Sequence, residues 1–68
     1  MTPSPSQVGQ AIRRLRRKKG VSQADLAARA GLSREYVNKI EAGKYDPPLS
    51  TLTALAKALR VRAARLLE

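Results

Sequence analysis

Most of the side chains in this 68-residue chain that could do chemistry are basic. Fourteen lysines and arginines stand against five acidic residues, which gives a formal net charge of +9 and a pI near 11.3. A positive field of this size raises the local concentration of polyanions and speeds their association. A soluble surface without a polyanionic partner would have the same composition, because net charge informs about partners and not about fold. The charge balance therefore favours a polyanionic partner.

Catalysis and metal binding find little support in the composition. The chain has no histidine and no cysteine, so the commonest general base, the commonest metal ligand, thiolate ligands and disulfides are all missing. The serines have no base to activate them, and the few carboxylates are scattered along the sequence. We expect a protein that is not an enzyme and that uses no metal or other cofactor.

The length of the chain predicts one domain with a marginal core, because domains of this size bury only about 60% of their unfolded surface. Without disulfides or metal, a partner subunit is the remaining source of extra stability. No apolar run approaches the ~18 residues of a membrane span, and residues 1–6 lack the charged and apolar segments of a signal peptide. We expect a cytoplasmic, nucleoid-associated protein with no membrane contact and no small-molecule ligand.

The spacing of apolar residues predicts an all-α domain over residues 7–68, preceded by a flexible Pro/Ser-rich arm over residues 1–6. An apolar stripe that starts at Val8 and continues at i+4 and i+7 defines the first helix. Two prolines exclude a helix at residues 44–48, and no segment alternates like a strand. The predicted domain has five short helices, near residues 6–19, 23–30, 34–42, 49–59 and 61–67.

The turn between the second and third predicted helices is the central feature of the sequence. Ser22 and Ser33 are candidate N-caps, and Gly31 suits a left-handed helix end. A short turn that contains glycine lets the following helix leave at a steep angle. That helix then projects far enough to enter a DNA major groove, which is about 12 Å wide. Residues 22–42 thus predict a helix-turn-helix. The spacing alone does not distinguish a DNA-binding motif from another helical hairpin, because every helical hairpin needs a turn.

The Cro/C1-type helix-turn-helix (XRE) family of phage repressors and small bacterial regulators is the family that this chain resembles. The resemblance extends from about Val8 to Leu67 and is strongest in the run SQADLAARAGLSREYVNKIEAGKYDPPLSTLTALAKAL. It implies a compact, lambda-repressor-like fold in which residues 33–42 form the recognition helix and in which dimers bind palindromic operators. The motif elements are Ser22-Gln23, Leu26-Ala27, Gly31-Leu32-Ser33, Val37, Ile40-Glu41, Gly43, Thr51-Leu52 and Leu55-Ala56.

The resemblance implies that four residues of the recognition helix contact DNA bases. Arg34 can bond bidentately to guanine, and Glu35 can accept a hydrogen bond from cytosine. Asn38 could contact adenine or a phosphate, and Lys39 a phosphate or guanine. In an alternative interpretation, Arg34 contacts phosphate while Glu35 orients its side chain. Both interpretations place the four side chains at the DNA.

Contacts to the DNA backbone are also implied by the resemblance, from Gln23, Ser33, Tyr36 and Lys44. The Gln23 amide and the free N–H groups at its helix end suit an anion, although an exposed helix former would look the same. Capping alone would explain Ser33, and Tyr36 could equally be packed against the domain. A solvated face that attracts DNA at long range is favoured over phosphate binding for the basic cluster of Arg13, Arg14, Arg17 and Lys18.

Glu41 has a different expected role from its neighbours on the recognition helix. It lies beside Ile40 on the inner edge of that helix, where a lone carboxylate would be costly. The resemblance places an arginine of the first helix against it, and Arg16 is the matching residue. We expect a structural ion pair between Arg16 and Glu41 that holds the recognition helix to the first helix.

The C-terminal part departs from the family pattern at Pro48, Arg60 and Arg62, which stand where relatives place a cap, a glycine and a polar N-cap. A left-handed helix end at Arg60 would cost ~1–2 kcal/mol because of its β-carbon, so the turn could differ there. Apolar residues exceed what one thin core needs, which favours a dimer. The predicted dimer interface consists of Leu49, Val61, Leu66 and Leu67.

The leading functional hypothesis is a sequence-specific, homodimeric regulator that binds double-stranded DNA, as a phage-type repressor or a restriction–modification controller does. Such a protein would be governed by its own concentration, through dimerisation and cooperative operator binding. The alternative is a protein-interaction module with the same fold, of the antitoxin or coactivator-like kind. Binding to a palindrome with half-sites about one helical turn apart would separate the two hypotheses.

Overall fold

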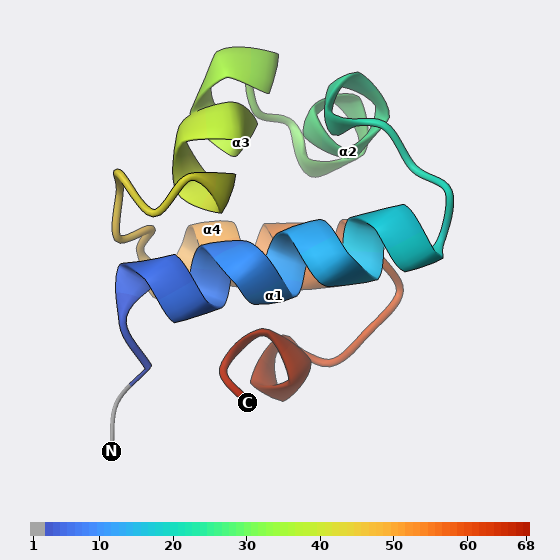
Figure 1. Cartoon of the computed structure of the whole chain (residues 1–68). Coiled ribbons are helices and arrows are strands. Elements are labelled where there is room, and N and C mark those ends of the chain that lie inside the picture. The colour runs from blue at the N-terminus through green and yellow to red at the C-terminus, as the bar shows by residue number, and fades with distance from the viewer. Residues whose placement is uncertain (1–2) are drawn as a thin grey trace.

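The structure, a computed structural model, describes residues 3–68, and over these residues it is all-helical with no strand. Helices α2 and α3 lie on one side of α1, α4 lies behind α1, and the C-terminal turn lies on the opposite side (Figure 1). The all-α prediction is confirmed, but the expected fifth α-helix is a single 3-10 turn. The elements are α1 Pro5–Lys18, α2 Gln23–Ala30, α3 Arg34–Glu41, α4 Leu49–Ala58 and η1 Ala63–Leu66.

Helix α1 begins earlier than expected, because a complete capping box precedes it. The Ser4 hydroxyl accepts a hydrogen bond from the Gln7 amide N–H, the Gln7 side chain accepts one from the Ser4 N–H, and Pro5 occupies the first turn. The expected arm over residues 1–6 is therefore wrong for residues 4–6, and residues 1 and 2 lie outside the described part of the chain. The spacing Ser4-x-x-Gln7 was a readable sign of this start.

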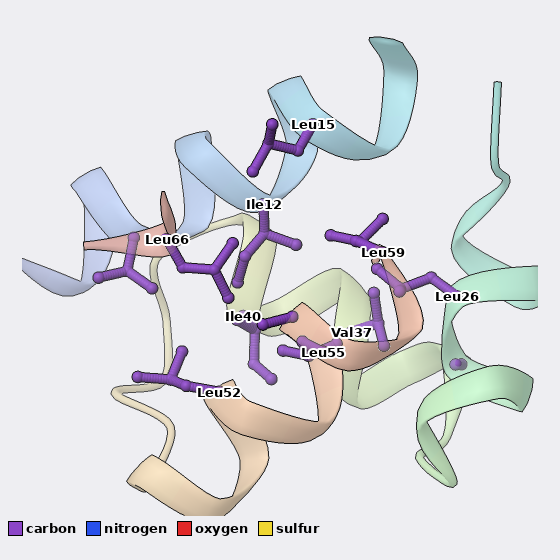
Figure 2. Close-up of a cluster of buried hydrophobic side chains, with 12 residues drawn as sticks. Ile12, Leu15, Leu26, Val37, Ile40, Leu52, Leu55, Leu59 and Leu66 are labelled. Carbon is purple, nitrogen blue, oxygen red and sulfur yellow. The ribbon is translucent and has the colours of Figure 1, made fainter. Parts of the chain in front are cut away.

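The core of the domain receives side chains from every element (Figure 2). The apolar stripe predicted for the first helix is confirmed, because Val8, Ile12 and Leu15 are buried. Each of the other three helices also buries apolar side chains. Figure 2 shows the inner face of α3 between α1 and α4. The largest fully buried side chains within residues 3–68 are Ile12, Leu26, Val37, Ile40, Leu55, Leu59 and Leu66.

The crossing of α1 and α3 depends on a glycine that the sequence analysis did not single out. A β-carbon at Gly9 would lie 2.7 Å from the carbonyl oxygen of Glu41 and closer still to that of Ile40. The backbone of α1 thus touches the last turn of α3, and any larger residue would push the two helices apart. Gly9 therefore sets how closely the C-terminal end of α3 approaches α1.

The turn after α4 keeps the left-handed geometry although it has no glycine. Arg60 has a φ of 58°, and the chain closes with hydrogen bonds from the Arg60 N–H to the Lys57 carbonyl and from the Val61 N–H to the Ala56 carbonyl. This is the Schellman pattern of a helix end. The family geometry is therefore retained, and the idea that the turn differs is wrong. The cost of the β-carbon at Arg60 remains.

Leu66 corrects the predicted dimer interface. Its side chain is fully buried, because η1 folds back against α1 and α4 and places Leu66 in the core. It therefore cannot contact a second subunit. Leu49 and Leu67 remain 69% and 41% exposed, and Val61 is partly buried against the core.

No helix within residues 3–68 combines the length and the apolar character that crossing a membrane requires.

Candidate nucleic-acid interface

Helix α3 has two clearly different faces. Val37 and Ile40 on its inner face are buried, whereas Arg34, Glu35 and Asn38 are exposed. The Ser33 hydroxyl caps the helix by accepting a hydrogen bond from the Tyr36 N–H at 3.1 Å. Lys44 is exposed just beyond the helix, and Lys39 is half-buried. The structure thus brings the four predicted base-contacting residues to the outer side of one helix whose inner side is locked in the core.

Glu41 receives hydrogen bonds from two helices besides its own. Arg16 of α1 donates to both carboxylate oxygens, at 2.6 Å from Nε and 3.0 Å from Nη2, and its Nη1 donates to the Val21 carbonyl at 2.9 Å. Arg13 donates from Nε at 3.3 Å, and Gln23 at the start of α2 donates at 3.1 Å. The expected partners Arg16 and Glu41 are in contact, while the contributions of Arg13 and Gln23 were missed.

The balance of burial and hydrogen bonding keeps Glu41 ionised. Burial by itself would raise the pKa of its carboxyl, but the hydrogen bonds from Arg16 and Gln23 outweigh it and hold that pKa below the ordinary value of 4.5. The hydrogen bond between Arg16 and Glu41 also raises the pKa of the Arg16 guanidinium. A bidentate, charge-assisted contact of this kind is directional as well as strong. Glu41 therefore fixes the position of α3 relative to both α1 and α2.

Gln23 connects this buried group to the exposed face of α3. Its side-chain nitrogen donates to Glu41, so its oxygen points the other way and accepts a hydrogen bond from the Asn38 side chain at 3.4 Å. Because both ends of the amide are engaged, the rotation of Gln23 and the position of Asn38 depend on Glu41. The sequence indicated either a phosphate contact or an exposed helix former at Gln23, and its link between the two helices was not predicted.

Glu35 and Lys39 form an ion pair with each other at 3.1 Å, one helical turn apart. The Lys39 ammonium lies 5.6 Å from the centre of the Tyr45 ring, a cation–π distance. The hydrogen bond to Glu35, and then Tyr45, raise the pKa of Lys39. Tyr45 also lies 5.8 Å from the Tyr36 ring. Neither the pairing of Glu35 with Lys39 nor the role of Tyr45, in the loop that follows the recognition helix, was predicted from the sequence.

An open hollow of about 640 Å³ lies where α1 meets the first turns of α2 and α3. The basic cluster of the first helix, which was expected to be a solvated face, divides here. Arg13 and Arg17 line the hollow, whereas Arg14 and Lys18 do not. We call this feature the basic hollow; the lining residues used below are Arg13, Arg17, Ser22, Gln23, Arg34 and Asn38. Within residues 3–68, no three acidic side chains gather to hold a metal ion.

This chain is similar to proteins that are named as repressors or transcriptional regulators. The immunity repressor of Bacillus phage phi105 is 44% identical over 57 residues, which are 84% of this chain but 40% of that repressor. A transcriptional regulator of the helix-turn-helix type from Sinorhizobium fredii, y4dJ, is 44% identical over 54 residues, 79% of this chain and 70% of its own length. This chain therefore spans less than half of the phage repressor and most of the bacterial regulator.

Solved structures agree with these relatives. The restriction–modification controller protein C.AhdI from Aeromonas hydrophila superposes with a TM-score of 0.91 at 38% identity, over 93% of this chain and 96% of that protein. A hypothetical transcription factor from Neisseria superposes with a TM-score of 0.90 at 33% identity, over the whole of this chain. The model of the helix-turn-helix family HTH_3 matches residues 12–66. The chain belongs to this Cro/C1-type helix-turn-helix family of DNA-binding transcriptional regulators.

Proposed function

We propose that this protein is a repressor that binds a palindromic operator in double-stranded DNA as a homodimer, with residues 33–42 as the recognition helix. The observation that carries the proposal is the division of α3 into a buried inner face and an outer face with four polar side chains. Glu41 holds that helix at a fixed angle, so the outer face can enter a major groove without rearrangement of the domain.

Four side chains of the outer face have distinct tasks in the proposed complex. Arg34 donates bidentately to a guanine, and Asn38, steadied by Gln23, bonds to an adenine. Lys39 exchanges Glu35 for a DNA acceptor as the groove is entered, which frees Glu35 to accept from a cytosine. Ser33 and Lys44 contact the flanking phosphates. An operator half-site with both G·C and A·T pairs follows from this assignment.

The homodimer is supported by apolar side chains that this protomer leaves exposed. Leu49 at the start of α4 and Leu67 at the chain end are 69% and 41% exposed, and burial of such side chains favours association. A two-fold dimer presents two recognition helices related by symmetry, which matches a palindrome. The names of two relatives, a phage immunity repressor and a restriction–modification controller, support a regulatory role.

Selection of bound duplexes from a random pool tests the operator. We expect a palindrome with half-sites about 34–36 Å apart, one helical turn of DNA, and an affinity that falls steeply with salt. Arg34→Ala should weaken binding by ~1–3 kcal/mol and relax the preference at one base pair. Arg62→Ala, which removes the same charge at the C-terminal side, is the matched control. Equal binding to all duplexes would overturn the proposal.

Sedimentation of the free protein tests the dimer. The double variant Leu49→Glu/Leu67→Glu should be monomeric. It should bind the operator much more weakly, because the two recognition helices are no longer linked in one dimer. A wild-type protein that stays monomeric at concentrations that saturate the operator would remove the homodimer from the proposal.

A further inference from the structure

The basic residues on the outer side of α1 form two strips. Arg13 and Arg17 are four residues apart, and so are Arg14 and Lys18, and the two strips are separated by about 100° around the helix. Only the first strip faces the basic hollow. Both strips carry the same formal charge, and the fold gives them different surroundings.

The basic hollow contains more hydrogen-bond donors than acceptors. Arg13 uses Nε for Glu41, and within residues 3–68 its two Nη groups make no hydrogen bond. Arg17 and Arg34 form no ion pair in the described part of the chain. Glu41, the carboxylate that Arg13 contacts, is buried and already shared by Arg16 and Gln23. Several guanidinium groups thus line an open hollow, a pattern that matches the geometry of a phosphate.

We propose that Arg13 and Arg17 bind one phosphate of the DNA backbone in the basic hollow, together with Gln23, so that α1 is a third DNA-contacting element. This inference rests on the proposed function. A DNA phosphate fits better than a free one because the hollow is open and because Arg34 and Asn38, the proposed base contacts, line it as well. The bound phosphate fixes where the recognition helix enters the groove, and Arg13 joins it to Glu41.

The test compares two double variants on the selected operator. Arg13→Gln/Arg17→Gln and Arg14→Gln/Lys18→Gln both lower the net charge of +9 by two, on the same helix. The first should reduce the slope of log affinity against log salt by about 0.9 for each lost phosphate contact, hence about 1.8 for a dimer. The second should leave that slope near the wild-type value. An equal reduction of the slope in both variants would show that the charges act only through the general electrostatic field of the protein, and it would overturn the inference.

A scan with single methylphosphonate linkages in the operator locates the contact. One neutral linkage in each half-site should weaken the wild type and should not weaken Arg13→Gln/Arg17→Gln further. If the neutral linkage and the variant weaken binding additively at every position, they do not act on the same contact, and the inference is contradicted. If the double variant does not fold, Arg17→Gln with Arg14→Gln as control repeats the comparison, because Arg17 has no side-chain hydrogen bond within residues 3–68.

Two further outcomes separate the possible failures. If the wild type has no preferred duplex, the proposed function fails; if it has one and the two double variants behave alike, only the phosphate contact fails. Inorganic phosphate titrated against the free protein and followed by NMR should bind weakly. Tight, saturable binding of inorganic phosphate that requires Arg13 and Arg17, with no difference between the variants on DNA, would assign the hollow to a free phosphate and overturn the inference.

Discussion

The region where α1, α2 and α3 meet is stabilised in a different way from the C-terminal third, which starts at Pro48. Each of the first three helices begins at a serine whose hydroxyl accepts a hydrogen bond from a backbone N–H. Glu41 joins all three helices through its hydrogen bonds. In contrast, α4 and η1 begin without a side-chain cap, and their connection contains a left-handed Arg60. The C-terminal third is held chiefly by burial of Leu52, Leu55, Leu59 and Leu66.

The difference follows from what each region must do. Hydrogen bonds and ion pairs are directional, so they fix the angle of α3, the helix that we expect to enter the groove. Apolar burial is non-directional, so it supports α4 and η1 without fixing every local angle. Uncapped helix starts and a strained residue are therefore tolerated where only burial is required. Variants in the two regions should differ in kind as well as in size.

The largest effect is expected for Glu41→Ala. It leaves the buried Arg16 without its carboxylate, and breaking a buried pair by removing one partner costs about 3–5 kcal/mol. Urea unfolding measures the loss. Glu35→Ala is the control, since it removes an exposed carboxylate from the same helix and should cost no more than about 1 kcal/mol. Wild-type stability in Glu41→Ala would contradict a structural role for the pair.

Leu66→Ala should have the next largest effect, in the region without caps. Truncation of a fully buried leucine costs about 2–5 kcal/mol, because a transfer term and a cavity term add. Leu67→Ala, at a residue that is 41% exposed, should cost much less. If Leu66→Ala instead kept its stability and lost only self-association, Leu66 would belong to a dimer interface after all.

Acid should weaken the hydrogen-bonded region before it weakens the apolar one. The pKa of Glu41 is lowered in the folded protein, so its contribution is fully present above the unfolded pKa, near 4.5, and is lost as the pH falls through the folded value. The free energy of unfolding, measured from pH 7 down to pH 3, should therefore fall less in Glu41→Gln than in the wild type. An osmolyte that does not titrate in this range, such as sucrose, can be added to both proteins if the variant is too unstable. Identical pH profiles would contradict this assignment.

The smallest effect, and the only gain, is expected for Arg60→Gly. Relief of the left-handed strain of ~1–2 kcal/mol exceeds the ~0.4–1 kcal/mol that glycine costs through the unfolded chain, so stability should rise by about 0.5–1 kcal/mol. Arg62→Gly, where the backbone is extended, should lower stability instead. Thermal unfolding of both variants measures the difference. A loss of stability in Arg60→Gly would mean that the Arg60 side chain contributes contacts that outweigh the strain.

Sequence reasoning succeeded where the governing interactions are local. The serine caps of α2 and α3, the glycine end of α2 and the buried stripe of α1 were predicted because they depend on residues no more than one or two turns apart. The early start of α1 was equally local, in the Ser4-x-x-Gln7 box, and was missed only because the proline and serine content suggested an arm. The pairing of Arg16 with Glu41 came from the family resemblance and not from the local pattern.

The remaining site features join residues that are far apart in the chain, so no local pattern contains them. Arg13 and Glu41 are 28 residues apart, and Gln23 and Asn38 are 15 apart. The contact between Arg13 and Glu41 exists because α1 approaches the last turn of α3 closely at Gly9. Likewise, an apolar residue such as Leu66 fits a core or an interface equally well until the fold-back of η1 decides.

By itself, the sequence determined the helices, their buried faces and the basic character of the surface, because periodicity, capping and charge are properties of short segments and of composition. Only the tertiary structure decided which arginines of α1 line the basic hollow and which leucines stay exposed. The physical reason is that helix crossing angles, and not side-chain types, bring side chains from different helices within hydrogen-bonding distance. In this protein, the crossing of the helices places Arg34 and Asn38 of α3 beside Arg13 and Arg17 of α1 on one surface.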